Sequence, residues 1–156
     1  PEPLIQKEFS RIMSLKDGSK KMSKSELSDL SRINLTDDSD LIVNKIKKAK
    51  TDPLPMPNSI KDLNERLEAK NLLGIYSSLT NSTMEKSVDN FAGKNFSEFK
   101  EKLSEVLVDR IQPISLEIKK LLKDKSYLDS TLLEGVERAN KIASQKIKRI
   151  KEIVGF

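Results

Sequence analysis

The pentapeptide Lys21–Ser25 (KMSKS) concentrates the residues of this sequence that are best suited to binding phosphate. It places two ammonium groups and two hydroxyls within five positions, shortly after the Gly-containing turn Asp17–Ser19. Lysine is a mobile point charge for phosphate, while hydroxyls and backbone N–H groups donate directed hydrogen bonds. An arbitrary Lys/Ser cluster is more often a solvated basic loop. The flanking sequence must therefore distinguish a phosphate loop from a solvated one.

The composition limits both the fold and the chemistry of the chain. The sequence has 156 residues, a formal net charge of +5, 34% charged residues, few Gly and Pro and only 4% aromatic residues, which favours helices around an aliphatic core. The absence of Cys and His excludes disulfides, thiol nucleophiles, imidazole catalysis and metal sites built from these side chains. The net positive charge permits a polyanionic partner. No apolar run approaches the ~20 residues that cross a bilayer, so no membrane partner is expected.

Short strands and turns are predicted around the pentapeptide. Arg11–Leu15 is a short apolar run stopped by a Gly-containing turn, which predicts a buried strand. Ser25 is expected to cap a short helical turn over Glu26–Ser31, and Ile33–Leu35 is a second strand candidate. Together these elements predict a small α/β unit at the start of the chain.

The rest of the chain is predicted to be helical. The acidic stretch Thr36–Asp40 starts a helix that closes with lysines at its C-terminal end, as the helix dipole favours. Three prolines at alternate positions make Thr51–Ser59 an extended linker. Apolar residues at helical spacing from Leu63 to Leu79 then predict an amphipathic helix of about five turns.

Three more helices complete the prediction. Their expected starts are a capping box over Ser82–Glu85, Asn95, and Ser126 paired with Asp129. The first ends at Gly93 and the last at Gly155, while Pro113 predicts a kink or short break in the helix between them. Short loops between long amphipathic helices indicate a mainly α fold, an antiparallel helical bundle preceded by the α/β remnant.

Several blocks resemble the bacterial-type tryptophanyl-tRNA synthetases, class I enzymes whose ATP loop carries the KMSKS signature. In chain order the blocks are Arg11–Leu15, Lys16–Gly18, Lys21–Ser25, Ile33–Asp38, Lys50–Pro53, Asn71–Tyr76, Phe96–Lys100 and Ile153–Phe156. The resemblance covers essentially the whole sequence. It implies only the C-terminal half of such an enzyme, because the family's first phosphate motif contains a His and this chain has none.

The resemblance implies a division into two parts. Residues 1–36 would be the C-terminal edge of a Rossmann-type catalytic domain that carries the ATP loop. Residues 37–156 would be a helical anticodon-binding domain, with its last helix packing back on the catalytic domain. The pocket that selects tryptophan would lie in the N-terminal half.

The same resemblance implies that the intact enzyme uses ATP to form tryptophanyl-adenylate and then charges tRNA(Trp). Negative charge builds up on the departing pyrophosphate, so cations placed there favour the reaction. Lys21 and Lys24 are expected to be catalytic, with Lys24 the more important. Gly18 would let the loop close over ATP, and a plain turn glycine is the equal alternative. The implied nucleotide contacts are Ile12, Lys21, Met22, Ser23, Lys24 and Ser25. Mg2+ would be carried by the phosphates, with no metal site on the protein.

The implied partners are tRNA(Trp), the N-terminal half of the enzyme and a second copy in a homodimer, in the cytoplasm or the mitochondrial matrix. A basic face of the last helix could contact the tRNA backbone, through Arg138, Lys141, Lys148, Arg149 and Lys151; a solvated helix face is the equal alternative. Two other interpretations stay open: a non-catalytic basic helical module that binds RNA or protein, and a tyrosyl-tRNA synthetase. The isolated chain is expected to be inactive.

Overall fold

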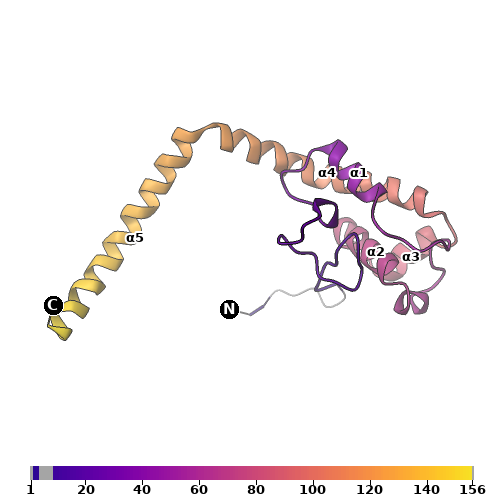
Figure 1. Cartoon of the computed structure of the whole chain (residues 1–156), viewed down its shortest axis with the longest axis horizontal. Coiled ribbons are helices and arrows are strands. Elements are labelled where there is room, and N and C mark those ends of the chain that lie inside the picture. The colour runs from indigo at the N-terminus through magenta and orange to yellow at the C-terminus, as the bar shows by residue number, and fades with distance from the viewer. Residues whose placement is uncertain (1, 4–8, 156) are drawn as a thin grey trace. The chain divides into compact units, whose positions relative to one another are not determined.

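The computed structural model describes residues 2–3 and 9–155, and the mainly α fold is confirmed. The chain divides into two compact units, Pro1–Ser115 and Leu116–Phe156. Over the described residues there is no β-strand, and the elements (Figure 1) are the 3-10 helices η1 (Asp29–Ser31) and η2 (Lys61–Asn64) and the helices α1 (Ser39–Lys47), α2 (Leu67–Thr80), α3 (Met84–Phe91), α4 (Phe96–Lys123) and α5 (Lys125–Val154). Phe156, the end of the last family-like block, lies outside the described residues.

The predicted strand Arg11–Leu15 is wrong, because the segment pairs too briefly to form a ladder. One isolated antiparallel bridge joins Met13 to Lys21, flanked by the bonds from Met22 N to Ile12 O (3.1 Å) and from Ser14 N to Lys20 O (2.8 Å). Two arms with so few bonds are a hairpin-like loop and not a sheet. The second candidate, Ile33–Leu35, also forms no strand.

Leu15 leaves the hairpin and joins two other segments. Its N–H donates to the carbonyl of Ser31 (2.9 Å), and its own carbonyl accepts from the N–H of Lys50 (2.7 Å). The Leu15 side chain is buried in the core of the first unit, together with apolar residues of α1 to α4 such as Ile42, Ile46, Leu72, Leu73, Val88, Phe99 and Leu103. The hairpin is therefore attached to the helical core at its base.

The helices around this core are held by contacts of three kinds. The α2 and α3 helices lie side by side (Figure 1), and Tyr76, Phe91 and Phe99 form an edge-to-face aromatic cluster. At the end of α1, the buried Nζ of Lys100 donates to the carbonyls of Lys47 (3.1 Å) and Ala49 (2.7 Å). Burial without a carboxylate partner lowers the pKa of Lys100.

The proline-rich segment is extended as predicted, but it packs on the core and does not act as a free linker. Met56 is only 1% exposed. Its N–H donates to Lys94 O (2.8 Å), and its carbonyl accepts from Gly93 N (3.2 Å). The helix predicted between Leu63 and Leu79 starts later, since η2 and a break precede α2.

Several helix ends match the predictions, while two α-helix caps move by one or two residues. The turn expected after Ser25 is shorter than predicted, because η1 covers only Asp29–Ser31 and its N-cap is Ser28. Asp38 caps α1 by accepting from Leu41 N at 2.9 Å, and the positive φ at Gly155 ends α5. Thr83, rather than Ser82, caps α3, because the Ser82 hydroxyl is bonded to those of Thr80 and Ser87. The cap of α5 is likewise the carboxylate of Asp124, and Ser126 donates to it.

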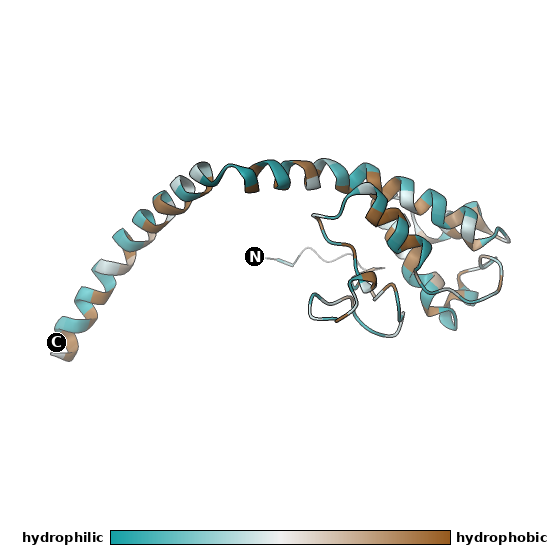
Figure 2. Cartoon of the chain, turned by 45° about the horizontal axis from the view of Figure 1, so that its top comes forward, coloured by the Kyte–Doolittle hydropathy of each residue, from teal (hydrophilic) through white to brown (hydrophobic). Residues whose placement is uncertain are grey.

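The second unit is dominated by α5, which has no buried residue. Figure 2 shows hydrophobic bands recurring along the helix. The exposed apolar residues of α5 include Leu132, Val136, Ile147 and Ile150. The helix α4 runs without interruption through Pro113, so the predicted break is absent. No helix in the described part of the chain has the length and apolarity needed to cross a membrane.

Candidate functional site

The pentapeptide lies beside an open groove of about 910 Å³ in the first unit. Three segments line this groove: Ser10–Ile12, Lys21–Lys24 and Arg32–Leu35. We call it the KMSKS groove. Lys21 and Lys24 are exposed, whereas Met22 and Ser23 are half-buried. The two ammonium groups are therefore free to meet a soluble anion and are not enclosed by helices.

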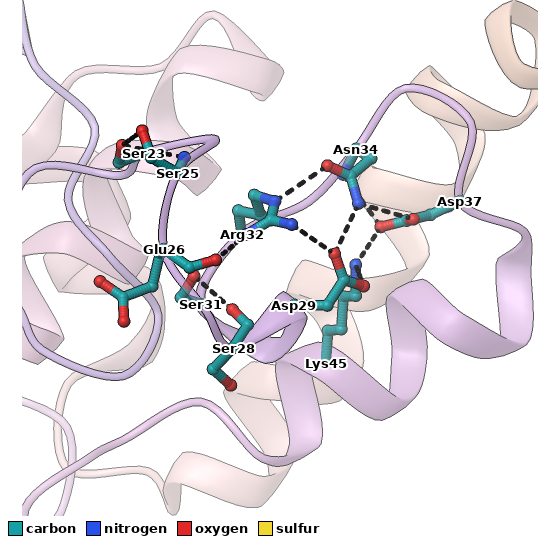
Figure 3. A network of polar contacts seen from close by, with 10 residues as sticks. All are labelled: Ser23, Ser25, Glu26, Ser28, Asp29, Ser31, Arg32, Asn34, Asp37 and Lys45. Carbon is teal, nitrogen blue, oxygen red and sulfur yellow. Dashed lines mark hydrogen bonds and ion pairs between the residues drawn. The ribbon is translucent and has the colours of Figure 1, made fainter.

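The structure brings together all but one of the predicted site residues. Ile12, Lys21, Met22, Ser23 and Lys24 line the groove. The sixth, Ser25, is absent from the lining and lies behind Ser23. Its N–H donates to the Ser23 hydroxyl at 3.3 Å, and the two hydroxyls are also 3.3 Å apart (Figure 3).

The hairpin determines how Ile12 and the pentapeptide face each other. The bond from Met22 N to Ile12 O fixes the two arms at this point. The Ile12 side chain is 46% exposed, so this residue of the predicted buried strand does not enter the core. On the outer side of the hairpin, the amide of Asn71 in α2 accepts from Met13 N and donates to Met13 O, both at 2.9 Å.

The turn between the arms is packed against the start of α2. An added Cβ on buried Gly18 would lie 2.9 Å from the backbone atoms Leu67 C and Glu68 N. The Glu68 carboxylate accepts hydrogen bonds from Lys50, at 2.8 Å, and from the Gly18 backbone. These bonds lower the pKa of Glu68. Close packing against α2 therefore gives one reason for a glycine at this position, and the predicted role of Gly18 in loop closure stays a prediction.

Arg32 and Asn34 of the third wall of the groove belong to a polar cluster, which Figure 3 shows from close by. The Nζ of Lys45 is 2.6 Å from Asp37 Oδ2 and 2.7 Å from Asp29 Oδ2. Asn34 donates from its backbone N–H to Asp37 (2.9 Å) and from its side-chain amide to Asp29 (3.0 Å). Arg32 pairs with Asp29 at 3.0 Å. These five residues are called the Lys45 cluster below.

The cluster is charge-balanced and partly buried. Two cations, Lys45 and Arg32, face two carboxylates, Asp29 and Asp37. The Lys45 side chain is fully buried and Asp37 is 5% exposed. Hydrogen bonds from Lys45 and Asn34 lower the pKa of Asp29, and the bond from Lys45 has the larger effect. Removing either partner of the buried Lys45–Asp37 pair would leave an uncompensated buried charge, which would destabilise the fold.

The sequence interpretation missed Arg32 and the whole Lys45 cluster. It treated Lys45 as one of several lysines that complement the helix dipole of α1. The available signal was position: Ile42, Lys45, Ile46 and Ala49 follow the i, i+3, i+4, i+7 spacing of a buried helix face. A lysine on such a face needs a carboxylate partner. Asp37, eight residues earlier, was available.

The side chains that line the groove are of types that suit an anion. Exposed lysines and a serine hydroxyl line the KMSKS groove, while the Lys45 cluster neutralises itself and leaves those lysines unpaired by its carboxylates. Lysine and hydroxyl groups suit a polyphosphate, whose oxygens accept several hydrogen bonds.

A comparison with known protein families identifies the class of protein to which this chain belongs. The family of tRNA synthetases class I (W and Y) matches residues 1–112. The chain belongs to this family.

Curated relatives narrow the resemblance. The chain is 48% identical over 155 residues to a tryptophan–tRNA ligase from Agrobacterium fabrum, covering 99% of this chain and 44% of the relative. It is 49% identical over 156 residues to a tryptophan–tRNA ligase from Rickettsia felis, covering all of this chain and 47% of the relative. The chain thus spans a little under half the length of these relatives. The sequence-based resemblance to the C-terminal half of a tryptophanyl-tRNA synthetase is confirmed.

Solved structures agree with the fold. A tryptophanyl-tRNA synthetase from Campylobacter jejuni, complexed with ADP and tryptophan, matches the whole chain and 47% of its own with a TM-score of 0.74, at 22% identity. A tryptophanyl-tRNA synthetase from Mycoplasma pneumoniae matches 74% of the chain with a TM-score of 0.61, at 27% identity.

Proposed function

We propose that this chain supplies the phosphate-binding loop and the helical part of a tryptophan–tRNA ligase. The observation that carries the proposal is the KMSKS groove: the pentapeptide presents two exposed lysines on an open groove shared with Ile12. Two kinds of comparison support it, since the class I family covers residues 1–112 and the curated relatives are tryptophan–tRNA ligases. The proposed reaction is ATP-dependent formation of tryptophanyl-adenylate, followed by transfer to tRNA(Trp).

Each of the six predicted site residues has a proposed role. Lys21 and Lys24 bracket the polyphosphate, and Lys24 stabilises the charge that develops on the departing pyrophosphate. Ser23 donates to a phosphate oxygen, and Ser25 supports Ser23 through the 3.3 Å contacts behind it. Ile12 and the backbone at Met22 contact the adenine. When ATP is bound, Mg2+ carried by its phosphates adds further charge neutralisation.

The domain roles are proposals of the same kind. Residues 1–36 belong to the catalytic domain and residues 37–156 to the anticodon-binding domain, although Leu15 and the Lys45 cluster tie the first segment to the second within one unit. The partners proposed are the N-terminal half of the enzyme, a second copy in a homodimer, and tRNA(Trp). A cytoplasmic setting follows from the same function.

The test uses a chimera in which this chain replaces the matching 44% of the Agrobacterium fabrum relative. The chimera should catalyse pyrophosphate exchange that depends on tryptophan and not on tyrosine. Lys24→Ala should lower the exchange rate about 100-fold or more, while the affinity for tryptophan stays within about 2-fold. The matched control, Lys16→Ala, removes an exposed lysine outside the groove and should change neither value.

Two outcomes would contradict the proposal. A chimera that binds tryptophan but catalyses no tryptophan-dependent pyrophosphate exchange would show that this chain does not supply the phosphate-binding loop of such an enzyme. Equal losses of rate and tryptophan affinity in Lys24→Ala would remove Lys24 from the phosphate site.

The RNA-binding role has its own test, on the basic face of α5. Binding of tRNA(Trp) to the chimera should weaken steeply between 50 and 200 mM salt, by about 10-fold or more if several phosphate contacts are made. Replacing Lys148, Arg149 and Lys151 with Gln should flatten that dependence. A salt response identical to that of the parent chimera would remove this end of α5 from the interface.

A further inference from the structure

Within the Lys45 cluster, Arg32 is the residue that also bonds to the pentapeptide loop (Figure 3). Its Nη1 donates to the carbonyl O of Glu26, the residue after Ser25, at 2.9 Å. Its Nη2 lies 3.0 Å from Asp29 Oδ1, and its Nε donates to Asn34 Oδ1 at 3.2 Å. One planar guanidinium therefore bonds to the loop, to η1 and to the third wall of the groove.

The far end of this connection is fixed in the core. Asp29, which pairs with Arg32, also lies 2.7 Å from the Nζ of Lys45. Lys45 is fully buried in α1 and held by Asp37 on its other side. A buried cation between two carboxylates cannot move without leaving charges unpaired, which is costly. Asp29 therefore gives Arg32 a rigid attachment point.

The loop has little else to hold it. The remaining bonds made by residues 23–27 in the described structure stay within the loop: Ser25 to Ser23 at 3.3 Å, and Glu26 N to Ser23 O at 3.5 Å. Leu27 is fully exposed. In the described part of the chain, the bond from Arg32 to Glu26 O is the hydrogen bond that attaches this stretch to the core.

We propose that Arg32 is a positioning residue that fixes the C-terminal end of the pentapeptide loop and thereby holds Lys24 at the groove. This deepens the proposed function and rests on it, since Lys24 is the group being positioned. Arginine is required because its planar fork offers donors to Glu26, Asp29 and Asn34 at once. Lysine would keep the charge and lose two of these three bonds.

The first test measures backbone mobility in the 156-residue chain. In Arg32→Lys, 15N relaxation order parameters of the amides of residues 24–27 should fall by about 0.2 or more from the values of the parent chain. The matched control is Arg66→Lys. Arg66 is another half-buried arginine, which binds Asp52 through two nitrogens (2.9 and 2.7 Å) and Leu54 O at 3.4 Å, and it does not line the groove.

The control separates positioning from a general loss of stability. Arg66→Lys should leave the order parameters of residues 24–27 unchanged. Asp29→Asn keeps the size of the side chain and leaves the Lys45–Asp37 pair intact, so it should fold and loosen the same amides. Unchanged mobility of these amides in Arg32→Lys and Asp29→Asn, or an equal change in Arg66→Lys, would overturn the proposal.

The second test measures kinetics in the chimera. Arg32→Lys should lower the rate of tryptophan-dependent exchange at saturating ATP about 10-fold, with the KM for tryptophan within about 2-fold. Arg66→Lys should change both values less than about 2-fold, and a change equal to that of Arg32→Lys would overturn the proposal. A parent chimera without exchange would refute the proposed function alone, because the mobility test still decides whether Arg32 fixes the loop.

Discussion

The side-chain amide of Asn71 forms a two-way hydrogen bond with the backbone of Met13, 58 positions earlier in the chain. Both bonds are 2.9 Å long, one donated by Nδ2 to the Met13 carbonyl and one accepted by Oδ1 from the Met13 N–H. Asn71 is 2% exposed. Asn71 forms the hydrogen bonds with the Met13 N–H and carbonyl that a neighbouring strand would otherwise form. It therefore connects α2 to the hairpin arm that carries Ile12.

Asn71→Asp should destabilise the protein by about 1–3 kcal/mol, because the Met13 carbonyl loses its donor and meets a buried carboxylate oxygen instead. Urea unfolding followed by circular dichroism measures the change. The control Asn90→Asp lies on an exposed position of α3 and should stay within about 0.5 kcal/mol of the parent. Equal stability of the Asn71 and Asn90 variants would show that the two-way bond contributes nothing.

Gly18→Ala and Gly135→Ala should have opposite effects. A Cβ at Gly18 would meet backbone atoms of α2 at 2.9 Å, which cannot move aside as a flexible side chain could, so the loss should be about 1–3 kcal/mol. A Cβ at Gly135 in α5 meets nothing within 4 Å, and alanine should favour the helix by about 0.5–1 kcal/mol. Thermal unfolding followed by far-UV circular dichroism gives both signs. A neutral Gly18→Ala would mean that the turn is free to move away from α2.

Much of the helical fold was accessible from the sequence because its signals are local. The Asp38 cap, the extended proline segment and the positive-φ Gly155 each depend on a few neighbouring residues. The strand prediction for Arg11–Leu15 failed because a strand needs partners. This segment pairs with Lys20–Met22 in a hairpin, with Asn71 in α2 and with the Ser31 carbonyl, none of which its composition indicates.

The candidate site was also only partly predictable from the sequence. The pentapeptide was evident from its spelling and its exposed lysines, but the residues that hold it were not. Arg32, Asp29 and Lys45 meet across 16 positions of sequence, through contacts that only the folded chain brings together. Lysines 45, 47 and 48 look alike in sequence, and only Lys45 is buried. Lys45 is buried because it lies on the same face of α1 as Ile42 and Ile46.

Lys45→Met should be among the most damaging single changes in the first unit. It leaves buried Asp37 without a cation, which should cost about 3 kcal/mol or more of the free energy of unfolding. The double variant Lys45→Met/Asp37→Asn removes the orphaned charge and should recover part of the loss. Lys102→Met breaks an exposed pair with Glu105 and should have little effect. A double variant no more stable than Lys45→Met would show that packing, rather than charge, keeps the lysine buried. Urea midpoints at constant slope measure all three variants.

The stability of the chain should fall with acid through the carboxylates whose pKa the fold lowers. Asp29 is held below its ordinary pKa of 3.8 by the bonds from Lys45 and Asn34, and Glu68 below 4.5 by Lys50. A group with a lowered pKa binds fewer protons when folded than when unfolded, so its contribution is complete above the unfolded value. It is lost as the pH falls through the folded value. The urea midpoint should therefore be level near pH 6 and decline from about pH 5 to below pH 3.8.

Asp29→Asn should flatten that decline, whereas Glu117→Gln, which removes an exposed carboxylate from α4, should keep the parent slope. A midpoint that rises toward pH 3 would contradict the assignment of stabilising, ionised carboxylates at Asp29 and Glu68.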